Sequence, residues 1–376
     1  MLTADTLEIG VDALQVTPCG AGVPRYVREL IRSLPDVLSS TERVTAFVQR
    51  GALNDLPAGS GSLSYRVFPN RSTWQRIVTQ QVFLRSIARG FNVVHFPDYL
   101  TPFFWKGTPF ALTIHDMAYA ADARFFTYAQ QSLRRFANPL GIRRASHVMV
   151  DSQFTRSEVL RLFPDVSGSK VSVIYPGVPR FEAHANFSEV TRRHGLPTRF
   201  VLSVGTLEPR KNVDSLLQAF ARPELAHESL VLVGREGWGP GLERRLRSDP
   251  ALARRIFTTG QISDAELAAL YREAAAFAYV SLYEGFGFPL LEALSAGLPA
   301  VASDIPVFKE ITRGAALYVD ANSPEGIARG IRRVLDSSDL REHLRKAGEA
   351  VARTYTWRSC ADGVISVYRE ISARLR

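Results

Sequence analysis

Short apolar runs rich in β-branched residues alternate with amphipathic stretches along the whole chain. The first of these runs is LEIGVDA at residues 7–13, and the pattern starts again in the second half with RFVLSVG at residues 199–205. Strands that alternate with helices pair in parallel, and the helices cover both faces of the resulting sheet. The sequence therefore predicts an α/β fold built from parallel sheets.

The length of 376 residues exceeds what one hydrophobic core usually organises, which predicts two domains. A polar stretch without a strand pattern, FEAHANFSEVTRRHGLP, separates the two sets of strands. We predict two doubly wound, Rossmann-like domains that face a cleft and bind ligands at the carboxyl ends of their strands. The predicted segments are an N-terminal domain (1–182), a linker (183–198), a C-terminal domain (199–355) and a terminal helix (356–376).

The composition excludes several classes of protein. With 46% hydrophobic and 22% charged residues, the chain is an ordinary globular sequence and is not disordered. Only two cysteines are present, which excludes a disulfide framework and fits a reducing cytoplasm. The N-terminus does not resemble a signal peptide, and no apolar run is long enough to span a membrane. We therefore expect a cytoplasmic location.

Positive charge is concentrated in one segment of the N-terminal half. Between Arg66 and Arg144 the chain has eleven Lys or Arg residues, opposed only by Asp98, Asp116 and Asp122. A nucleic-acid groove, an anionic membrane surface, an anionic substrate or simply a solvated basic face would each explain this excess. Charge alone leaves these alternatives open.

The stretch EGFGFPLLEALSAGLPAVASD begins at Glu284 and follows the apolar run AAAFAYVS. Pro289 suits the first turn of a helix, and Gly297 followed by a proline suits its end. The N-terminus of a helix with glycine nearby is a ready phosphate site, and Glu292 could accept hydrogen bonds from ribose hydroxyls. Alternatively, Glu292 only favours the helix dipole and Glu284 is a solvated loop residue.

Three backbone amides at the start of this predicted helix are expected to be free for a phosphate: Gly287, Phe288 and Leu290. Two carboxylates also occur in glycosidases, but there they flank one bond from two sides. Two acids on one loop and its helix are poorly placed for that chemistry, so we reject a glycosidase.

The stretch SVGTLEPRKNVDSLLQAF places Arg210 and Lys211 between a strand that ends at Gly205 and a helix that Asn212 is expected to cap. Adjacent cations beside a helix N-terminus suit a diphosphate and could stabilise the charge that builds on a departing phosphate. The plain alternative is a surface Arg-Lys pair.

Two further loops follow strands of the first half. Gly20-Ala21-Gly22 resembles the start of a dinucleotide fingerprint, but Arg25 occupies the place of the third glycine, so NAD binding is weakly supported. As a glycine-lined loop, it could still close over a phosphate through Gly22. In FALTIHD, His115 and Asp116 follow a buried strand, where His115 could bind a sugar, act as an acid or base, or be a structural histidine.

Known metal motifs are missing from the sequence. It contains no Asp-X-Asp, His-Glu-X-X-His or Cys-X-X-Cys, and we predict no metal site and no cofactor. Gly-X-Ser-X-Gly and Walker motifs are also absent.

Seven motifs in order make the chain resemble a retaining glycosyltransferase of family 4, which has the GT-B fold. They are GAGVPRYV, TIHD, VIYPGV, SVGTLEPRKN, LVG, TGQISDAELAALYREA and EGFGFPLLEALSAGLPAVASD. The resemblance implies catalytic roles for Glu284 and His115, which would touch the transferred sugar, and for Arg210 and Lys211, which would grip the diphosphate of a nucleotide sugar. It further implies that the C-terminal helix crosses back to the N-terminal domain.

The same resemblance implies the residues that bind the donor. Glu292 would hold the ribose, and the base would lie near two strand ends. The implied donor-binding set, besides Arg210 and Lys211, is Gly22, Gly234, Ile262, Gly287, Phe288, Leu290 and Glu292.

The implied reaction needs neither a metal nor a protein nucleophile, and it retains the anomeric configuration. The LEIGVDA and TLEPRKN variants look similar to bacterial mannosyltransferases, so the expected donor is GDP-mannose. The expected acceptor is a glycan or lipid-linked glycan in polysaccharide or lipopolysaccharide biosynthesis, with peripheral contact to an anionic inner membrane and no nucleic-acid partner. A sugar-nucleotide epimerase of the same architecture, or a two-lobed sugar-binding protein, remains an alternative.

Overall fold

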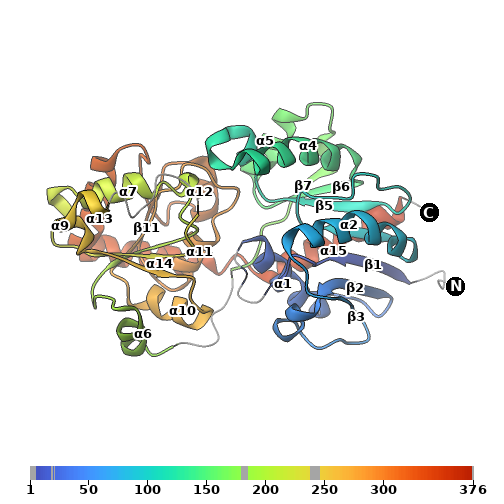
Figure 1. The fold of residues 1–376 in the computed structure, drawn as a ribbon, viewed down its shortest axis with the longest axis horizontal. Helices are drawn as coiled ribbons and strands as arrows, with labels where there is room; N and C mark the ends of the chain where they lie inside the picture. The colour runs from blue at the N-terminus through green and yellow to red at the C-terminus, as the bar shows by residue number, and fades with distance from the viewer. Residues whose placement is uncertain (1–5, 18–19, 21, 179–184, 238–245, 375–376) are drawn as a thin grey trace. The chain divides into compact units, whose positions relative to one another are not determined.

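The computed structural model describes residues 6–17, 20, 22–178, 185–237 and 246–374 (Figure 1). Contacts divide the chain into two compact units. The first contains the chain up to Ala121, Tyr128–Gly177, and the chain from Tyr355 onward. The second contains Asp122–Thr127 and Val178–Thr354. The predicted boundary at residue 182 lies outside the described residues.

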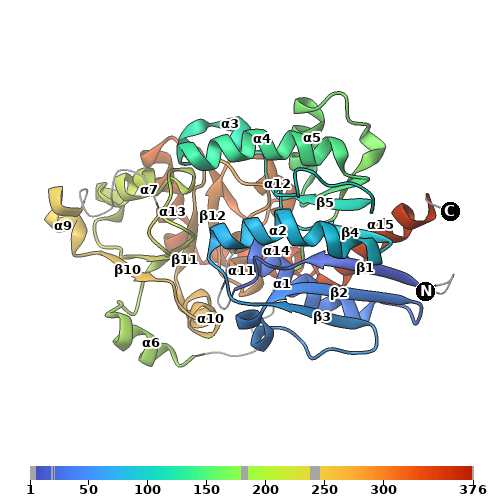
Figure 2. The same cartoon turned by 45° about the vertical axis from the view of Figure 1, so that its right-hand side comes forward.

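The first unit is built on a seven-stranded sheet whose strand pairs are all parallel. Its order is β3-β2-β1-β4-β5-β6-β7, so the chain winds outward from β1 in one direction and then in the other (Figures 1 and 2). The strands are β1 (Leu7–Asp12), β2 (Glu42–Gln49), β3 (Leu63–Phe68), β4 (Val93–Phe96), β5 (Phe110–Ile114), β6 (His147–Val150) and β7 (Val171–Val173).

α-Helices follow β1, β3, β5 and β6 of this sheet, in line with the alternating sequence pattern. The α-helices of the first unit are α1 (Val23–Ser33), α2 (Thr73–Ile87), α3 (Ala118–Ala121), α4 (Tyr128–Arg144), α5 (Gln153–Leu162) and α15 (Trp357–Ala373). Short 3₁₀ turns are η1 (Leu34–Asp36), η2 (Arg50–Asp55), η3 (Ala88–Gly90) and η5 (Gly168–Lys170).

The last helix, α15, packs on α1 and on the central strands of this sheet. The hydroxyl of Tyr368 lies 2.7 Å from Nδ1 of the buried His95. The guanidinium of Arg369 donates to both carboxylate oxygens of Glu42, at 2.6 and 3.0 Å. The C-terminal helix is therefore an integral part of the first unit.

The second unit has a six-stranded sheet, again with every pair parallel, in the order β10-β9-β8-β11-β12-β13. Its strands are β8 (Val201–Val204), β9 (Leu230–Val233), β10 (Ile256–Gly260), β11 (Ala276–Tyr279), β12 (Ala300–Ser303) and β13 (Leu317–Val319). Leucine, isoleucine and phenylalanine side chains of α7 and α13 pack against this sheet and form its core.

The described α-helices of this unit are α6 (Phe187–His194), α7 (Val213–Phe220), α9 (Pro250–Ala253), α10 (Asp264–Glu273), α11 (Phe288–Ser295), α12 (Pro306–Thr312), α13 (Pro324–Asp336) and α14 (Ser338–Ala352). Its described 3₁₀ turns are η4 (Ala123–Phe125), η6 (Pro209–Lys211) and η7 (Pro223–Leu225). Within the predicted linker, residues 187–194 form α6, which the Asn186 side chain caps and which packs against α10. This part of the linker is therefore helical and belongs to the second unit.

None of the helices in the described ranges combines the length and the apolar character that crossing a membrane requires.

Candidate functional site

The carboxyl ends of four neighbouring strands form one edge of the second unit. Gly205 follows β8, Gly234 follows β9, and their amides donate to the carbonyls of Val233 and Gly260. Gly234 has a φ of 145°, and a Cβ there would lie 2.0 Å from the carbonyl oxygen of Gly205. Only glycine fits this close approach of two strand ends. Ile262 is half-buried in the loop after β10, so both residues predicted to lie near the base follow strands at this edge.

The loop after β8 carries the turn η6 and then Asn212. As predicted, α7 begins after Asn212, but the expected capping role of its side chain is wrong. Asn212 adopts a left-handed conformation with a φ of 57° and makes no side-chain cap. Its amide instead donates to the carbonyls of Val280, at 3.1 Å, and Ala321, at 2.7 Å. The side chain thereby ties η6 to the ends of two other strands.

Arg210 and Lys211, from the loop after β8, meet Glu284, from the loop after β11, at this edge. Lys211 Nζ donates to Glu284 Oε1 at 2.6 Å and to the hydroxyl of Tyr279 at 2.7 Å. Arg210 donates through Nη1 to Glu284 Oε2 at 2.5 Å and through Nη2 to Glu208 Oε1 at 2.8 Å. Glu284 is buried, and the two cations are mostly shielded from water. We call these five residues the ion cluster.

The electrostatics of the ion cluster keep Glu284 charged. Burial alone would raise the pKa of this carboxyl, but Arg210 and Lys211 outweigh burial and lower it to about 2. Two cations are therefore held by carboxylates inside the protein. An incoming anion that takes N–H groups of Arg210 and Lys211 from these carboxylates would exchange one anion for another in this cluster.

We predict that Glu284→Gln lowers the free energy of unfolding by about 3–5 kcal/mol, because it leaves two partly buried cations without their shared carboxylate. Pyrophosphate should then raise the melting temperature of this variant more than that of the wild type, since no carboxylate has to be displaced. Thermal melts with and without pyrophosphate measure both effects.

Glu292→Gln is the matched control for that measurement, because Glu292 is also a buried glutamate but contacts Tyr271. It should respond to pyrophosphate as the wild type does. If pyrophosphate raised the melting temperature of Glu284→Gln and of the wild type equally, the anion-exchange interpretation would be contradicted.

The helix α11 begins where the sequence predicts. Gly287 is its N-cap with a φ of 116°, and a Cβ there would come within 3.0 Å of the Phe308 ring. The expectation that the Leu290 amide is free is wrong, because this amide donates to the carbonyl of Gly287 at 3.0 Å. A phosphate at this N-terminus would share that amide with the first turn. Phe288 is the first residue of the helix.

Glu292 lies one turn into α11 with its side chain buried, and its Oε2 accepts from the hydroxyl of Tyr271 at 3.0 Å. Tyr271 belongs to α10, which follows β10. Glu292 therefore joins two helices of the second unit. Hydrogen bonds to a ribose would add to this contact or replace it.

Gly22 and His115 lie in the first unit. Gly22 is the N-cap of α1, with a φ of 64°, and its carbonyl accepts from the amide of Tyr26. Ala21, between the two glycines of this loop, lies outside the described residues. Asp116 accepts from the amide of Ala118 at 3.0 Å and so holds the loop after β5.

His115 contacts an acceptor through each ring nitrogen. Nδ1 lies 2.7 Å from Oδ2 of the buried Asp151, and Nε2 lies 3.0 Å from the carbonyl oxygen of Pro97. Burial alone would lower the pKa of the imidazole, but Asp151 outweighs burial and raises it to about 9. A carbonyl can only accept, so Nε2 carries a proton, and the raised pKa favours a second proton on Nδ1, which faces Asp151. In this state His115 cannot act as a general base.

We predict that Asp151→Asn destabilises the protein more at neutral than at alkaline pH. The pKa of His115 is raised in the folded state, so its contribution is complete below its ordinary value of 6.5 and is lost as the pH rises through about 9. The difference in melting temperature between wild type and Asp151→Asn should therefore shrink towards alkaline pH. Melts across this range test the trend, and ¹⁵N NMR of the ring reports its protonation directly.

Asp116→Asn is the control, because Asp116 is adjacent in sequence to His115 and bonds to a backbone amide. It should leave the protonation of His115 nearly unchanged. A neutral His115 ring in the wild type at neutral pH would contradict this account.

Sequence reasoning missed four residues that shape these sites: Glu208, Tyr271, Tyr279 and Asp151. Asp151 directly follows β6, so the rule that found His115 could have found its partner. Glu208 lies two residues before Arg210 and was equally visible. Tyr279 lies within the apolar strand β11, where no sequence signal separates a tyrosine that bonds Lys211 from one that only packs.

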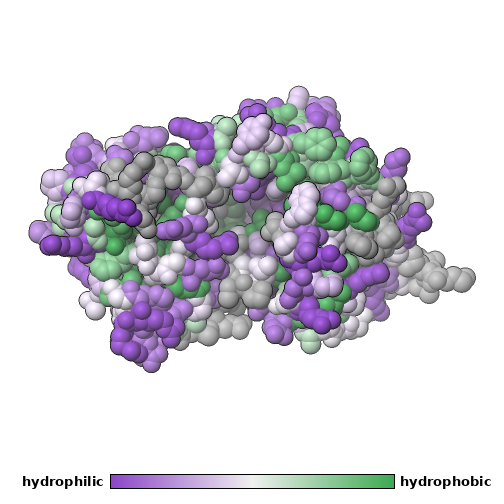
Figure 3. All heavy atoms as spheres, in the orientation of Figure 1, coloured by the Kyte–Doolittle hydropathy of each residue, from purple (hydrophilic) through white to green (hydrophobic). Residues whose placement is uncertain are grey.

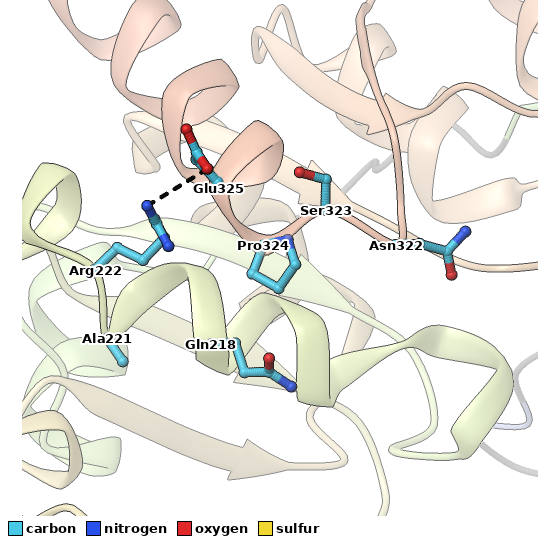
Figure 4. Close-up of a pocket in the computed structure, with 7 residues that line it drawn as sticks. All are labelled: Gln218, Ala221, Arg222, Asn322, Ser323, Pro324 and Glu325. Carbon is cyan, nitrogen blue, oxygen red and sulfur yellow. Dashed lines mark ion pairs between the residues drawn. The ribbon is translucent and has the colours of Figure 1, made fainter.

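A recess of about 530 Å³ lies elsewhere on the second unit, beside α7 and the start of α13 (Figure 4). Arg222 and Glu325, 3.7 Å apart, lie across it. Its lining residues are Gln218, Ala221, Arg222, Asn322, Ser323, Pro324 and Glu325. None of these belongs to the predicted site residues, and we assign the recess no role.

Two family models match the chain, one on each half. Residues 20–180 match "Glycosyltransferase Family 4", and residues 188–351 match "Glycosyl transferases group 1". The chain belongs to the GT4-type glycosyltransferases. This assignment confirms the family that the seven motifs indicate.

One curated relative is the O-antigen chain mannosyltransferase B of Escherichia coli, 32% identical over 233 residues. That match covers 60% of this chain and 61% of the relative, so the chain spans less than two thirds of that protein's length.

Two solved structures share the whole fold. Sucrose-phosphate synthase from Thermosynechococcus elongatus has a TM-score of 0.74 at 21% identity, over 98% of this chain and 100% of that one. The Anabaena protein Alr3699/HepE, solved in complex with UDP and glucose, has a TM-score of 0.72 at 17% identity, over 97% and 99%. The two parallel-sheet domains of the GT-B fold are thereby confirmed.

Proposed function

We propose that this GT4-type protein is a retaining, metal-independent glycosyltransferase that transfers mannose from GDP-mannose to a glycan or lipid-linked glycan in polysaccharide biosynthesis. The observation that carries the proposal is the ion cluster at the strand ends of the second unit. There Arg210 and Lys211 are held 2.5 and 2.6 Å from one buried carboxylate, Glu284.

The diphosphate of the donor takes the place of carboxylate oxygens around the two cations. The guanidinium of Arg210 offers a planar fork and Lys211 a compact charge, a pair that suits adjacent phosphates. Glu284, released from part of this pairing, is then available to the hydroxyls of the transferred sugar. Because the cations are preorganised and largely dry, they stabilise charge on a departing diphosphate more strongly than they would in water.

The reaction breaks the bond between the anomeric carbon and the diphosphate oxygen. That oxygen takes the proton of the acceptor hydroxyl, whose oxygen bonds to the anomeric carbon on the same face, so configuration is retained. Arg210 and Lys211 neutralise the leaving group, and no step requires a metal ion or a covalent enzyme intermediate. His115 and Gly22 enter the proposal through the family resemblance. A bond from His115 to the sugar would replace its bond to Pro97.

The remaining donor contacts lie at the same strand-end edge. Gly234 and Ile262 lie near the base, and Glu292 binds the ribose hydroxyls next to Tyr271. Helix α11 adds its N-terminus at Gly287 and Phe288, while Leu290 contributes an amide already shared with the first turn. Mannose is chosen because the Escherichia coli relative is an O-antigen mannosyltransferase. Binding of a nucleoside diphosphate is supported by the UDP complex of the Anabaena protein.

We predict that GDP, tested beside UDP, ADP and dTDP, raises the melting temperature of the wild type most. At a hundred times its dissociation constant a nucleotide adds about 2.7 kcal/mol to the free energy of unfolding, enough to measure. Glu292→Ala should lose most of this stabilisation, because the ribose contact is removed.

Glu342→Ala is the control, since Glu342 is a half-exposed acid on the outer helix α14. It should respond to GDP as the wild type does. A panel in which no nucleotide stabilises the wild type would contradict the proposed donor site. Equal stabilisation of Glu292→Ala would contradict the ribose contact.

A further inference from the structure

Three large apolar residues of the helix α2 in the first unit lie on its exposed side, where an ordinary surface helix carries polar residues. Trp74 is 72% exposed, Val78 41% and Val82 60%, and their spacing of four places them along one stripe. The buried side carries Thr79 and Gln80 together with the apolar Leu84. A helix that only covers a sheet turns its apolar stripe inward. The exposed stripe of α2 therefore needs another explanation.

Two neighbouring segments extend this stripe. The side chain of Gln81 in α2 binds the loop 99–107. It accepts from the amide of Phe103 at 2.8 Å and donates to the carbonyl of Thr101 at 3.1 Å. The ring of Phe103 packs against Phe136 of α4, with centroids 5.2 Å apart. The loop therefore lies beside α2, and α4 lies beside the loop. Phe104 of the loop is 77% exposed, and Phe136 of α4 is 60% exposed.

We call Trp74, Val78, Val82, Phe104 and Phe136 the apolar face. Every large hydrophobic side chain that is exposed among the described residues falls between positions 67 and 136, and five of the seven are in this face. Figure 3 shows apolar residues gathered at the surface over α2 and α4. Single exposed hydrophobics are normal on a protein surface, but such a concentration marks an interaction site.

The three segments that build the apolar face are strongly basic. Residues 73–87, 99–107 and 128–144 contain no Asp or Glu. They contain seven cations: Arg76, Arg85, Lys106, Arg134, Arg135, Arg143 and Arg144. Lys106, Arg135 and Arg144 are exposed beside the aromatic residues. The partner of this surface is therefore apolar at its centre and anionic around it.

Charge distinguishes between two possible partners of the apolar face, a second copy of the chain and an anionic bilayer. In a symmetric dimer the same face would meet itself, which would bring the cations of one copy against those of the other. An anionic bilayer instead offers negative headgroups to the cations and an interfacial layer to tryptophan and phenylalanine. The charge complementarity favours the bilayer.

We propose that the apolar face and its surrounding cations dock the first unit on an anionic membrane surface, with Trp74, Val82 and Phe104 inserted at the headgroup level. Docking adds to the proposed function, because it would place the enzyme where lipid-linked acceptors lie. It rests on the surface alone and needs neither donor nor acceptor.

The experiment is flotation of the full-length protein with phosphatidylcholine vesicles that contain or lack phosphatidylglycerol. We expect binding to the anionic vesicles at low salt and its loss near 1 M salt, where charges are screened within about 3 Å. The triple variant Trp74→Ser, Val82→Ser, Phe104→Ser should bind about tenfold more weakly or worse, because three apolar insertions are removed. Trp74→Phe should retain most of the binding.

A charge pair of variants locates the electrostatic part. Lys106→Glu with Arg135→Glu should weaken binding strongly. Lys346→Glu with Arg353→Glu, an equal change of charge on exposed residues of the second unit, should weaken it much less. If both double variants lost vesicle binding equally, net charge and not this face would drive binding, and the proposal would be overturned.

Two other results would also overturn it. One is the absence of flotation with anionic vesicles at low salt, and the other is unchanged flotation of the triple serine variant with an unchanged melting temperature. If sedimentation velocity shows a dimer for the wild type and a monomer for the triple serine variant, the apolar face binds a second copy of the chain. None of these readouts involves sugar transfer, so vesicle binding and the proposed activity can fail independently.

Discussion

The buried carboxylate of Glu284 is the centre on which the arrangement of the second unit's strand-end edge depends. Two cations that arrive from a different loop, Arg210 and Lys211, are brought to it within hydrogen-bonding distance. Without this carboxylate the two positive charges would repel each other in a poorly solvated place. Their pairing positions both side chains before a ligand arrives. Preorganised charge of this kind is what stabilises a leaving diphosphate.

The backbone makes this pairing possible. Asn212 is held in a left-handed conformation while its side chain binds the carbonyls of Val280 and Ala321, which fixes η6 beside the end of β11. Gly205 and Gly234 let two strand ends approach so closely that a side chain at Gly234 would collide with the neighbouring carbonyl. The parallel sheet thus gathers loops that are far apart in sequence at one edge. This is the physical reason why strand-end motifs predict a site in such folds.

The elements that sequence reasoning found are those with a strong pattern. The alternation of apolar runs and amphipathic stretches predicted β1 and β8 at nearly their observed ends. It passed over β13, a strand of three residues, and α6, a helix of mostly polar residues inside the predicted linker. The strand-end rule predicted that Arg210, Lys211 and Glu284 follow strands, but it did not predict their ion pairs, and their functional roles stay predictions.

The parts that could not be predicted depend on three-dimensional partners. The Asn212 side chain points to carbonyls up to 109 positions away and not to its own helix. The charge of His115 follows from the simultaneous presence of Asp151 and the Pro97 carbonyl, which no local motif encodes. The exposure of Trp74 and Val82 likewise depends on which side of α2 the sheet covers, because the helix itself has no clear amphipathic sequence pattern.

Sugar transfer from radiolabelled GDP-mannose to a membrane fraction rich in lipid-linked glycans, with EDTA present throughout, tests the proposed reaction directly. We expect one GDP released for each mannose transferred, an anomeric configuration in the product equal to that of the donor, and loss of transfer in Lys211→Ala. Transfer that requires an added divalent metal, or a product with inverted configuration, would contradict the proposed reaction.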